Sequence, residues 1–188
     1  LTILYVLIDD IADNYHMRDK SLLEKAIRIP LNDIDCSDDD SAYLRTTQKI
    51  WDDCKKDIKE LPCYEKLKDI FLFDISQVMN SMRYNFLINN ISFGNSIENS
   101  VYTPNGVMVM LHGDIDLMCI DELDTKELPK IRMITYFSQD IAHIGNLLST
   151  YPRAIREKDM SSPLILLGCE RGIIDMDDIE RDPVRTHE

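Results

Sequence analysis

The sequence opens with Leu1-Thr2-Ile3-Leu4-Tyr5-Val6-Leu7-Ile8-Asp9-Asp10-Ile11-Ala12-Asp13-Asn14-Tyr15, an apolar run that ends in three carboxylates. The run contains neither Gly nor Pro, and it predicts a buried helix over residues 1–15 that becomes polar at its C-terminal end. Asp9 and Asp13 lie on one face of that helix, about 6 Å apart along the axis. Because like charges repel and burial strengthens the repulsion, we expect a compensating cation. Mg²⁺ fits, since it takes carboxylate oxygens and keeps phosphate oxygens in its shell.

The composition describes an acidic protein with a helical lean. The chain has 188 residues, of which 44% are hydrophobic, and only six Gly and seven Pro. This length and composition predict one domain, residues 1–188, with a real core. A net charge of −13 argues against nucleic acid or an anionic membrane as the main partner. An anionic substrate would therefore need metal ions or local Arg and Lys.

The cysteines favour a reducing compartment. There are five of them, and no CxxC and no Cys/His pair with zinc spacing occurs. We therefore expect reduced thiols in a cytoplasmic protein. No signal peptide or transmembrane run is evident. The chain starts without Met and inside a helical pattern, which we interpret as part of a longer protein.

Hydrophobic periodicity predicts helices throughout, and no stretch alternates as a strand would. The expected helices cover residues 1–15, 21–29, 42–59, 64–89, 107–123 and 130–157, with a further apolar segment at 164–167. We expect residues 89–105 to form a loop and the 107–123 helix to be interrupted at residues 112–114. The predicted fold class is all-α, with helices packed side by side.

A second informative stretch is Asn146-Leu147-Leu148-Ser149-Thr150-Tyr151-Pro152-Arg153-Ala154. Asn146, Thr150 and Ala154 are spaced by four residues, so each step drifts only about 40° and all three share a face. An Asn carbonyl and a Thr hydroxyl can ligate Mg²⁺, and Arg153 can meet phosphate oxygens. Two helices, one with carboxylates and one with neutral oxygens, could thus hold several Mg²⁺ ions against a diphosphate.

Together these motifs make the chain resemble the catalytic α-domain of class I terpene synthases (terpene cyclases) of the bacterial type. That family carries an aspartate-rich DDxxD motif and a downstream NSE motif, (N/D)Dxx(S/T)xx(K/R)E. The matching residues are Asp9, Asp10, Asp13, Asn146, Thr150 and Arg153. The resemblance covers most of the chain. It implies a helical bundle around a central apolar cavity, incomplete here at both ends, because the family's C-terminal Arg-Tyr pair and its first helices have no counterpart.

The departures from the family pattern concern both halves of the site. The NSE glutamate position is Ala154, which cannot ligate a metal, and Glu157 on the next turn is the expected substitute. Pro152 inside the motif predicts a kink. At the family's central helix break, Asn105 occupies the linker position and Gly106 the effector position. The diphosphate-sensing Arg is replaced by Tyr102, and Arg83 is an alternative source of that charge.

The resemblance implies a carbon–oxygen lyase that acts on a linear C15 or C20 isoprenyl diphosphate. Three Mg²⁺ ions would join Asp9, Asp13, Asn146 and Thr150 to the diphosphate, which leaves as the allylic cation forms. The cation would cyclise in an apolar cavity that excludes water. Aromatic faces would stabilise the cation. The candidates are Phe71, Tyr84, Phe86, Tyr136 and Phe137. Homodimers are common in the family.

Two alternatives stay open. An isoprenyl chain-elongation synthase also uses two Asp-rich motifs, and residues 177–182 could mimic the second. A solvated acidic tail explains that stretch better. The other alternative is a non-catalytic helical protein or a cyclase with impaired activity, which Ala154 and Tyr102 favour. Release of diphosphate that depends on Mg²⁺ separates these alternatives.

Overall fold

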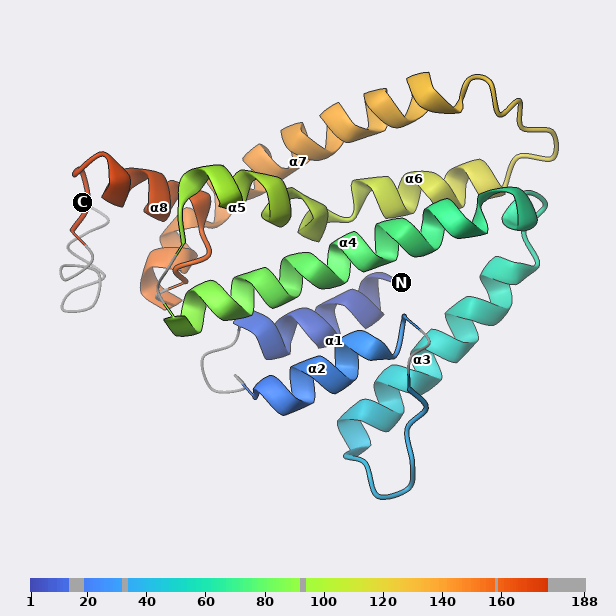
Figure 1. The fold of residues 1–188 in the computed structure, drawn as a ribbon, viewed down its shortest axis with the longest axis horizontal. Coiled ribbons are helices and arrows are strands. Elements are labelled where there is room, and N and C mark those ends of the chain that lie inside the picture. The colour runs from blue at the N-terminus through green and yellow to red at the C-terminus, as the bar shows by residue number, and fades with distance from the viewer. Residues whose placement is uncertain (14–18, 32–33, 92–93, 158, 176–188) are drawn as a thin grey trace.

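The computed structural model describes residues 1–13, 19–31, 34–91, 94–157 and 159–175. Within these ranges the chain forms eight α-helices and one 3₁₀ helix, without a strand, which confirms the all-α prediction (Figure 1). Two stretches considered above lie outside the described residues: the acidic residues 177–182 and residues 14–15 at the end of the first expected helix.

The N-terminal third folds into α1 (Thr2–Asp13), α2 (Lys20–Arg28) and α3 (Ala42–Lys59). Ser41 caps α3, because its hydroxyl accepts a hydrogen bond from the backbone N–H of Leu44 at 3.3 Å, as its position predicts. The Tyr43 hydroxyl donates to the carbonyl oxygen of Leu7 and so ties α3 to α1. Both α2 and α3 pack against α1.

Helix α4 (Tyr64–Ile91) is the centre of the molecule, as Figure 1 shows. It packs against α1, α2, α3, α5, the 3₁₀ helix η1 and α6. Its buried residues occur at helical spacing and include Leu67, Phe71, Ile75 and Met82. These side chains belong to the main core, together with Ile8, Ile11 and other apolar residues. Because α4 has neighbours on several sides, it buries more than one stripe of its surface.

The next segment contains a helix break, but not at residues 112–114, where the hydrophobic pattern predicts an interruption. Instead of a loop, residues 96–102 form α5 (Ser96–Tyr102), which continues into η1 (Thr103–Val107). Met108 then adopts a left-handed conformation with φ 60° and ψ 16°, and α6 (Val109–Met118) begins. The interruption expected at residues 112–114 is wrong, because α6 runs through them. A Cβ added to its Gly113 would lie 3.0 Å from Thr135 Cγ2, so the glycine allows α7 to approach α6 closely.

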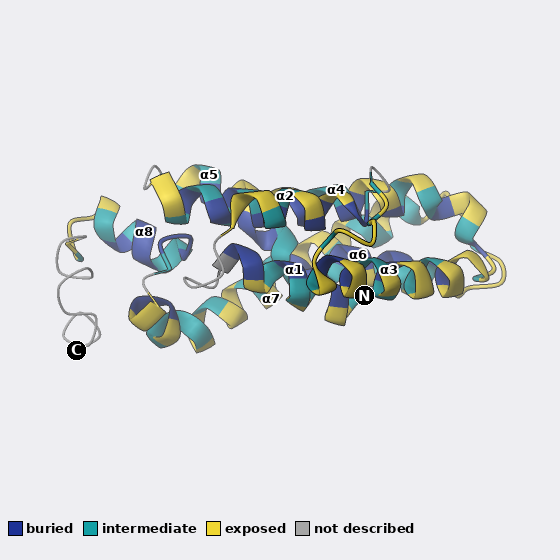
Figure 2. Ribbon diagram, turned by 90° about the horizontal axis from the view of Figure 1, so that it is seen from below, coloured by how far each residue is buried: buried dark blue, intermediate teal, exposed yellow. Residues whose placement is uncertain are grey.

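Helix α7 (Leu128–Glu157) is the longest element, and it is followed by α8 (Pro163–Glu170). It contains Pro152 and continues to Glu157. A surface helix usually buries its apolar stripe, yet in α7 the opposite occurs. The apolar side chains on one side are more than half exposed: Ile134 63%, Phe137 59%, Ile141 71%, Ile144 56% and Leu148 63%. Figure 2 shows α7 mostly in the colours of partly and fully exposed residues.

The face of α7 that meets the rest of the chain is partly polar. Arg132 and Gln139, seven residues apart and therefore on one face, both bond to other helices. Toward the C-terminal end of the helix, Thr150 is half-buried and Ala154 packs in an apolar cluster. The inward face of α7 is therefore polar around Arg132 and Gln139 and apolar near its C-terminal end.

In the described part of the chain, no helix has the length and apolar character needed to cross a membrane. All five cysteines lie in that part, and none forms a disulfide.

Candidate functional site

Asp9 is the centre of the candidate site. It lies on α1, half-buried, next to the exposed Asp10. The pKa of Asp9 is raised from 3.8 to about 6, chiefly because burial disfavours the charged carboxylate and then because Asp10 and Asp159 add negative charge. The Tyr5 hydroxyl, which hydrogen-bonds to Asp9, and the charge of Arg153 act in the opposite direction.

These electrostatic effects connect the two sequence motifs. Arg153 belongs to the second motif on α7, and its charge acts on a carboxylate of the first motif on α1. Arg153 is exposed and forms an ion pair with Glu157 at 3.5 Å. Glu157, the expected substitute for the missing glutamate, is therefore engaged with Arg153. Asp159 is, with Asp10, one of the two carboxylates whose charge acts on Asp9, and it was not among the predicted ligands.

The segment that follows α7 is held by Asp159. Its Oδ1 accepts hydrogen bonds from Asn89 Nδ2 at 3.0 Å, from the backbone N–H of Ser161 at 3.0 Å and from Ser161 Oγ at 2.6 Å. Asn89 Oδ1 in turn accepts from the backbone N–H of Met160 at 2.7 Å. These bonds fix the start of α8 on the end of α4, and with it a carboxylate whose charge raises the pKa of Asp9.

The neutral ligands predicted on α7 have a simpler environment. Asn146 is exposed and Thr150 is half-buried, and the Thr150 hydroxyl donates to the Asn146 carbonyl oxygen at 2.8 Å. The oxygen of that hydroxyl keeps lone pairs for another ligand. Ala154 is 8% exposed and packs in an apolar cluster with Tyr84, Ile88 and Met160.

The ionisation of Asp9 is opposed by burial and by two neighbouring carboxylates, so a cation bound there would relieve the cost of its charge. Among the described residues, no group of three His, Cys, Asp or Glu side chains that could hold a metal occurs. The side chain of Asp13, the last residue of α1, lies outside the described part. Any metal there would depend on neutral oxygens, water or substrate as well.

The helix break lies beside Tyr5, the residue whose hydroxyl bonds to Asp9. A Cβ added to Gly106 would lie 3.2 Å from Tyr5 Oη and 3.3 Å from Ser81 Oγ. Gly106 on η1, Tyr5 on α1 and Ser81 on α4 therefore meet. Asn105 is half-buried and donates through Nδ2 to the carbonyl oxygen of Tyr102 at 3.2 Å. Gly106, at the predicted effector position, thus lies against the Tyr5 hydroxyl that bonds to Asp9. Asn105, at the predicted linker position, precedes it in the sequence.

The remaining diphosphate and cavity candidates are dispersed. Tyr102 is 37% exposed, with its ring 4.8 Å from that of Tyr84. Arg83 is paired with Glu24, whose carboxylate accepts hydrogen bonds from its Nε and Nη2 at 3.1 to 3.3 Å. Phe71 and Phe86 are buried in the main core, and Tyr136 and Phe137 lie exposed on α7.

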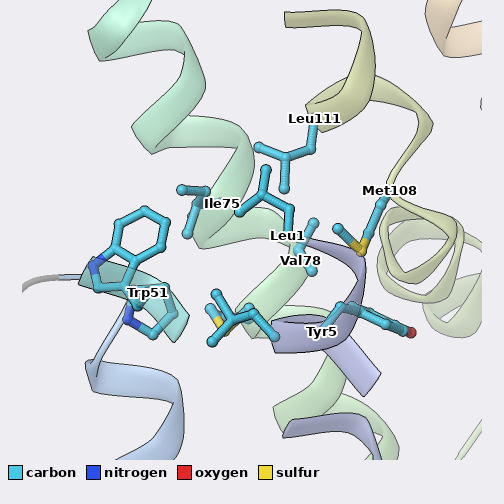
Figure 3. A pocket seen from close by; sticks show the side chains of 10 residues that line it. Leu1, Tyr5, Trp51, Ile75, Val78, Met108 and Leu111 are labelled. Carbon is cyan, nitrogen blue, oxygen red and sulfur yellow. The ribbon is translucent and has the colours of Figure 1, made fainter. Parts of the chain in front are cut away.

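A small apolar pocket lies next to Tyr5, between α1, α4 and α6 (Figure 3). In Figure 3 the Tyr5 ring borders the pocket and its hydroxyl points away from Trp51 on the far side. The pocket encloses about 10 Å³, room for about one water molecule. It cannot hold a prenyl chain as it stands, and none of the five predicted cavity aromatics lines it.

Three contributors were missed by the sequence analysis: Tyr5, Gln139 and Asp159. Tyr5 stands four residues before Asp9, on the same face of a helix, so helical spacing was enough to find it. Gln139 stands seven residues before Asn146 and so shares its face. Asp159 lies beyond the motif, and its position depends on the turn that follows α7.

Comparisons with known proteins do not identify the chain: no family model, no curated protein and no solved structure matches it. The functional assignment therefore depends on the site itself.

A matched pair of glycines tests the contact at the helix break. Gly106→Ala is expected to destabilise the protein by about 1 to 2 kcal/mol, because the added methyl crowds Tyr5 and Ser81. Gly145→Ala should stabilise it by about 1 kcal/mol, since Gly145 lies in exposed α7 with nothing within 4 Å of the added Cβ. Urea unfolding measures both. An equal change in the free energy of unfolding in the two variants would contradict the close approach of Tyr5 and Ser81 to Gly106.

Away from the site, a buried charge cluster joins three helices and makes stability depend on pH. Arg132 Nη1 lies 2.9 Å from Asp74 Oδ2 and 2.9 Å from Asp114 Oδ1. The pKa of Asp114 is raised from 3.8 to about 8, mainly by burial and then by its hydrogen bond with Asp74 and the charge of Asp74. The folded protein therefore keeps a proton that the unfolded chain releases near pH 4.

It follows that stability should fall as pH rises from about 4 to about 8 and then level off. Asp114→Asn is expected to flatten this dependence, because the amide imitates the protonated carboxyl. Asp116→Asn, at an exposed position on the same helix, is the control. Thermal unfolding between pH 5 and 9 gives the comparison. If Asp114→Asn leaves the dependence of stability on pH unchanged, a group other than Asp114 is responsible for that dependence.

Proposed function

We propose that this chain is a catalytic domain of the class I terpene cyclase type, which converts a linear C15 or C20 isoprenyl diphosphate to a cyclic terpene and releases diphosphate. One observation carries the proposal: Asp9 of the first motif is under the electrostatic influence of Arg153 of the second motif. The two motifs are separated by more than 130 residues in the sequence, so an electrostatic influence of one on the other supports their proximity in the fold.

In this proposal Asp9, Asp10, Asp13, Asn146 and Thr150 hold Mg²⁺ with the diphosphate oxygens. When bound, Mg²⁺ supplies Lewis-acid stabilisation of the leaving diphosphate. Tyr5 orients the Asp9 carboxylate through its hydrogen bond, and the exposed Arg153 guanidinium can pair with phosphate oxygens. Gly106 and Asn105 present the backbone of the helix break beside them. The apolar pocket between α1, α4 and α6 would have to widen to take a prenyl chain and exclude water from it.

The test is an incubation of the purified protein with Mg²⁺ and, separately, farnesyl and geranylgeranyl diphosphate. Gas chromatography of a hexane extract and a diphosphate assay are the readouts. A cyclic hydrocarbon or alcohol from one substrate supports the proposal and fixes the chain length. Absence of both products from a protein with a helical circular-dichroism spectrum contradicts it for the chain as it stands.

A second candidate, a cyclase with impaired activity, has an observation in its favour. Ala154 lies in an apolar cluster, where it contributes packing and no metal ligand.

Isopentenyl diphosphate added to the same assay tests the third candidate, a chain-elongation synthase, by the appearance of longer prenyl diphosphates. A cytoplasmic location and a homodimer complete the proposal.

A further inference from the structure

Gln139 is a buried polar residue on a helix whose other inward contacts are few. It is 1% exposed, and α7 buries only Ala154 and Ile155 besides it in the described part of the chain. An amide in such a place is costly unless its hydrogen bonds are made. Both ends of the Gln139 amide are used: Oε1 accepts from the backbone N–H of Met110 at 3.1 Å, and Nε2 donates to Asn105 Oδ1 at 3.3 Å.

The two partners lie on opposite sides of the helix break. Asn105 belongs to η1 and Met110 to the first turn of α6, with the left-handed Met108 between them. A non-glycine residue in this conformation persists where its surroundings hold it there. The Met110 N–H is one of the first amides of α6, which have no acceptor within their own helix. Gln139 supplies that acceptor from α7.

Asn105 extends the connection. Its Nδ2 donates to the carbonyl oxygens of Val101 at 3.4 Å and Tyr102 at 3.2 Å, the last residues of α5. The next residue, Gly106, lies against Tyr5, whose hydroxyl bonds to Asp9. A chain of direct contacts therefore runs from α7 through Gln139 and the helix break to α1.

We infer that Gln139 is a positioning residue that fixes the helix break at Met108 and couples it to α7. The side chain does not touch the reacting groups. It holds the backbone around Gly106 in one geometry relative to both motifs. The structural part of this inference stands on the hydrogen bonds alone, and its catalytic consequence rests on the proposed function.

Hydrogen exchange measured by NMR tests the structural part. Gln139→Leu removes both hydrogen bonds at similar volume, and the Met110 amide should then exchange about tenfold faster. Ser138→Ala is the control, because Ser138 is exposed and bonds only within α7. Core amides of α4 serve as the internal reference for global unfolding. A Met110 amide equally protected in both variants would overturn the inference.

A second measurement needs no variant. In the unmodified protein, the side-chain NH₂ of Gln139 should exchange more slowly than those of Gln48 and Gln77, which are only half-buried. Equal exchange at all three would contradict the hydrogen bond to Asn105.

The catalytic part is tested by steady-state kinetics. Gln139→Leu should lower kcat about tenfold with a smaller change in KM for the prenyl diphosphate, because the break acts on ionisation and not on binding. Loss of Met110 protection with kcat unchanged would overturn the coupling to catalysis. If the unmodified protein has no turnover, the proposed function fails, while the exchange experiment still decides the positioning role.

Discussion

Asp9→Asn is expected to lower the release of diphosphate that depends on Mg²⁺ by about 10²- to 10³-fold, while the folded protein becomes more stable above pH 6. Activity is lost because the amide cannot supply the negative charge that a divalent cation needs. Stability rises because the pKa of Asp9 is about 6 in the folded protein, above the ordinary value of 3.8 that applies to the unfolded chain. Ionisation of Asp9 therefore opposes folding by up to about 2 to 3 kcal/mol.

The sign of the pH dependence follows from the raised pKa. Between about pH 4 and pH 6 the unfolded chain loses the Asp9 proton and the folded chain keeps it, so stability contributed by this group falls over that interval. Asp9→Asn should remove the part of the fall that Asp9 contributes and leave the part that Asp114 contributes. Asp53→Asn, at an exposed position of α3, is the matched control for charge. Activity retained by Asp9→Asn would exclude the metal role of Asp9.

Ala154→Glu should increase turnover and Mg²⁺ affinity by about 10- to 100-fold, because it restores the carboxylate that the NSE motif places there. The structure adds a cost. Ala154 is 8% exposed among Tyr84, Ile88 and Met160, so the larger side chain should lower the free energy of unfolding by about 1 to 3 kcal/mol. Kinetics with varied Mg²⁺ and urea unfolding measure the two effects separately.

Ala154→Gln is the control for this change, since it has nearly the same size and no charge. It should carry a similar stability cost without the gain in Mg²⁺ affinity. Equal turnover in both variants and the unmodified chain would mean that the alignment of residues 146–154 with the NSE motif is wrong.

Local pattern predicted most helices, and it failed where a backbone conformation decides the outcome. Helical spacing and the Ser41 cap placed residues 42–59 and most of residues 64–91 correctly. The break before α6 depends on the left-handed Met108, and methionine gives no local signal for it. Gly113, which does look like a breaker, lies inside a regular helix.

The metal and substrate roles of the two motifs stay predictions. The charge of Arg153 is one of the influences on the pKa of Asp9. The roles of Tyr5, Gln139 and Asp159 depend on tertiary contacts with residues distant in sequence. Likewise, the apolar residues of α7 suggest a buried stripe, but the hydrogen bonds of Arg132 and Gln139 turn its polar face inward.

The central claim is that the motifs on α1 and α7 form one site for a metal and a diphosphate. The most direct test replaces Mg²⁺ with paramagnetic Mn²⁺ in the presence of inorganic diphosphate and measures relaxation of the backbone amides by NMR. The account predicts that amides near Asp9 and those of residues 146–153 broaden together, and that Asp9→Asn removes both effects. Broadening at one motif alone, or broadening spread over the exposed acidic residues, would contradict it.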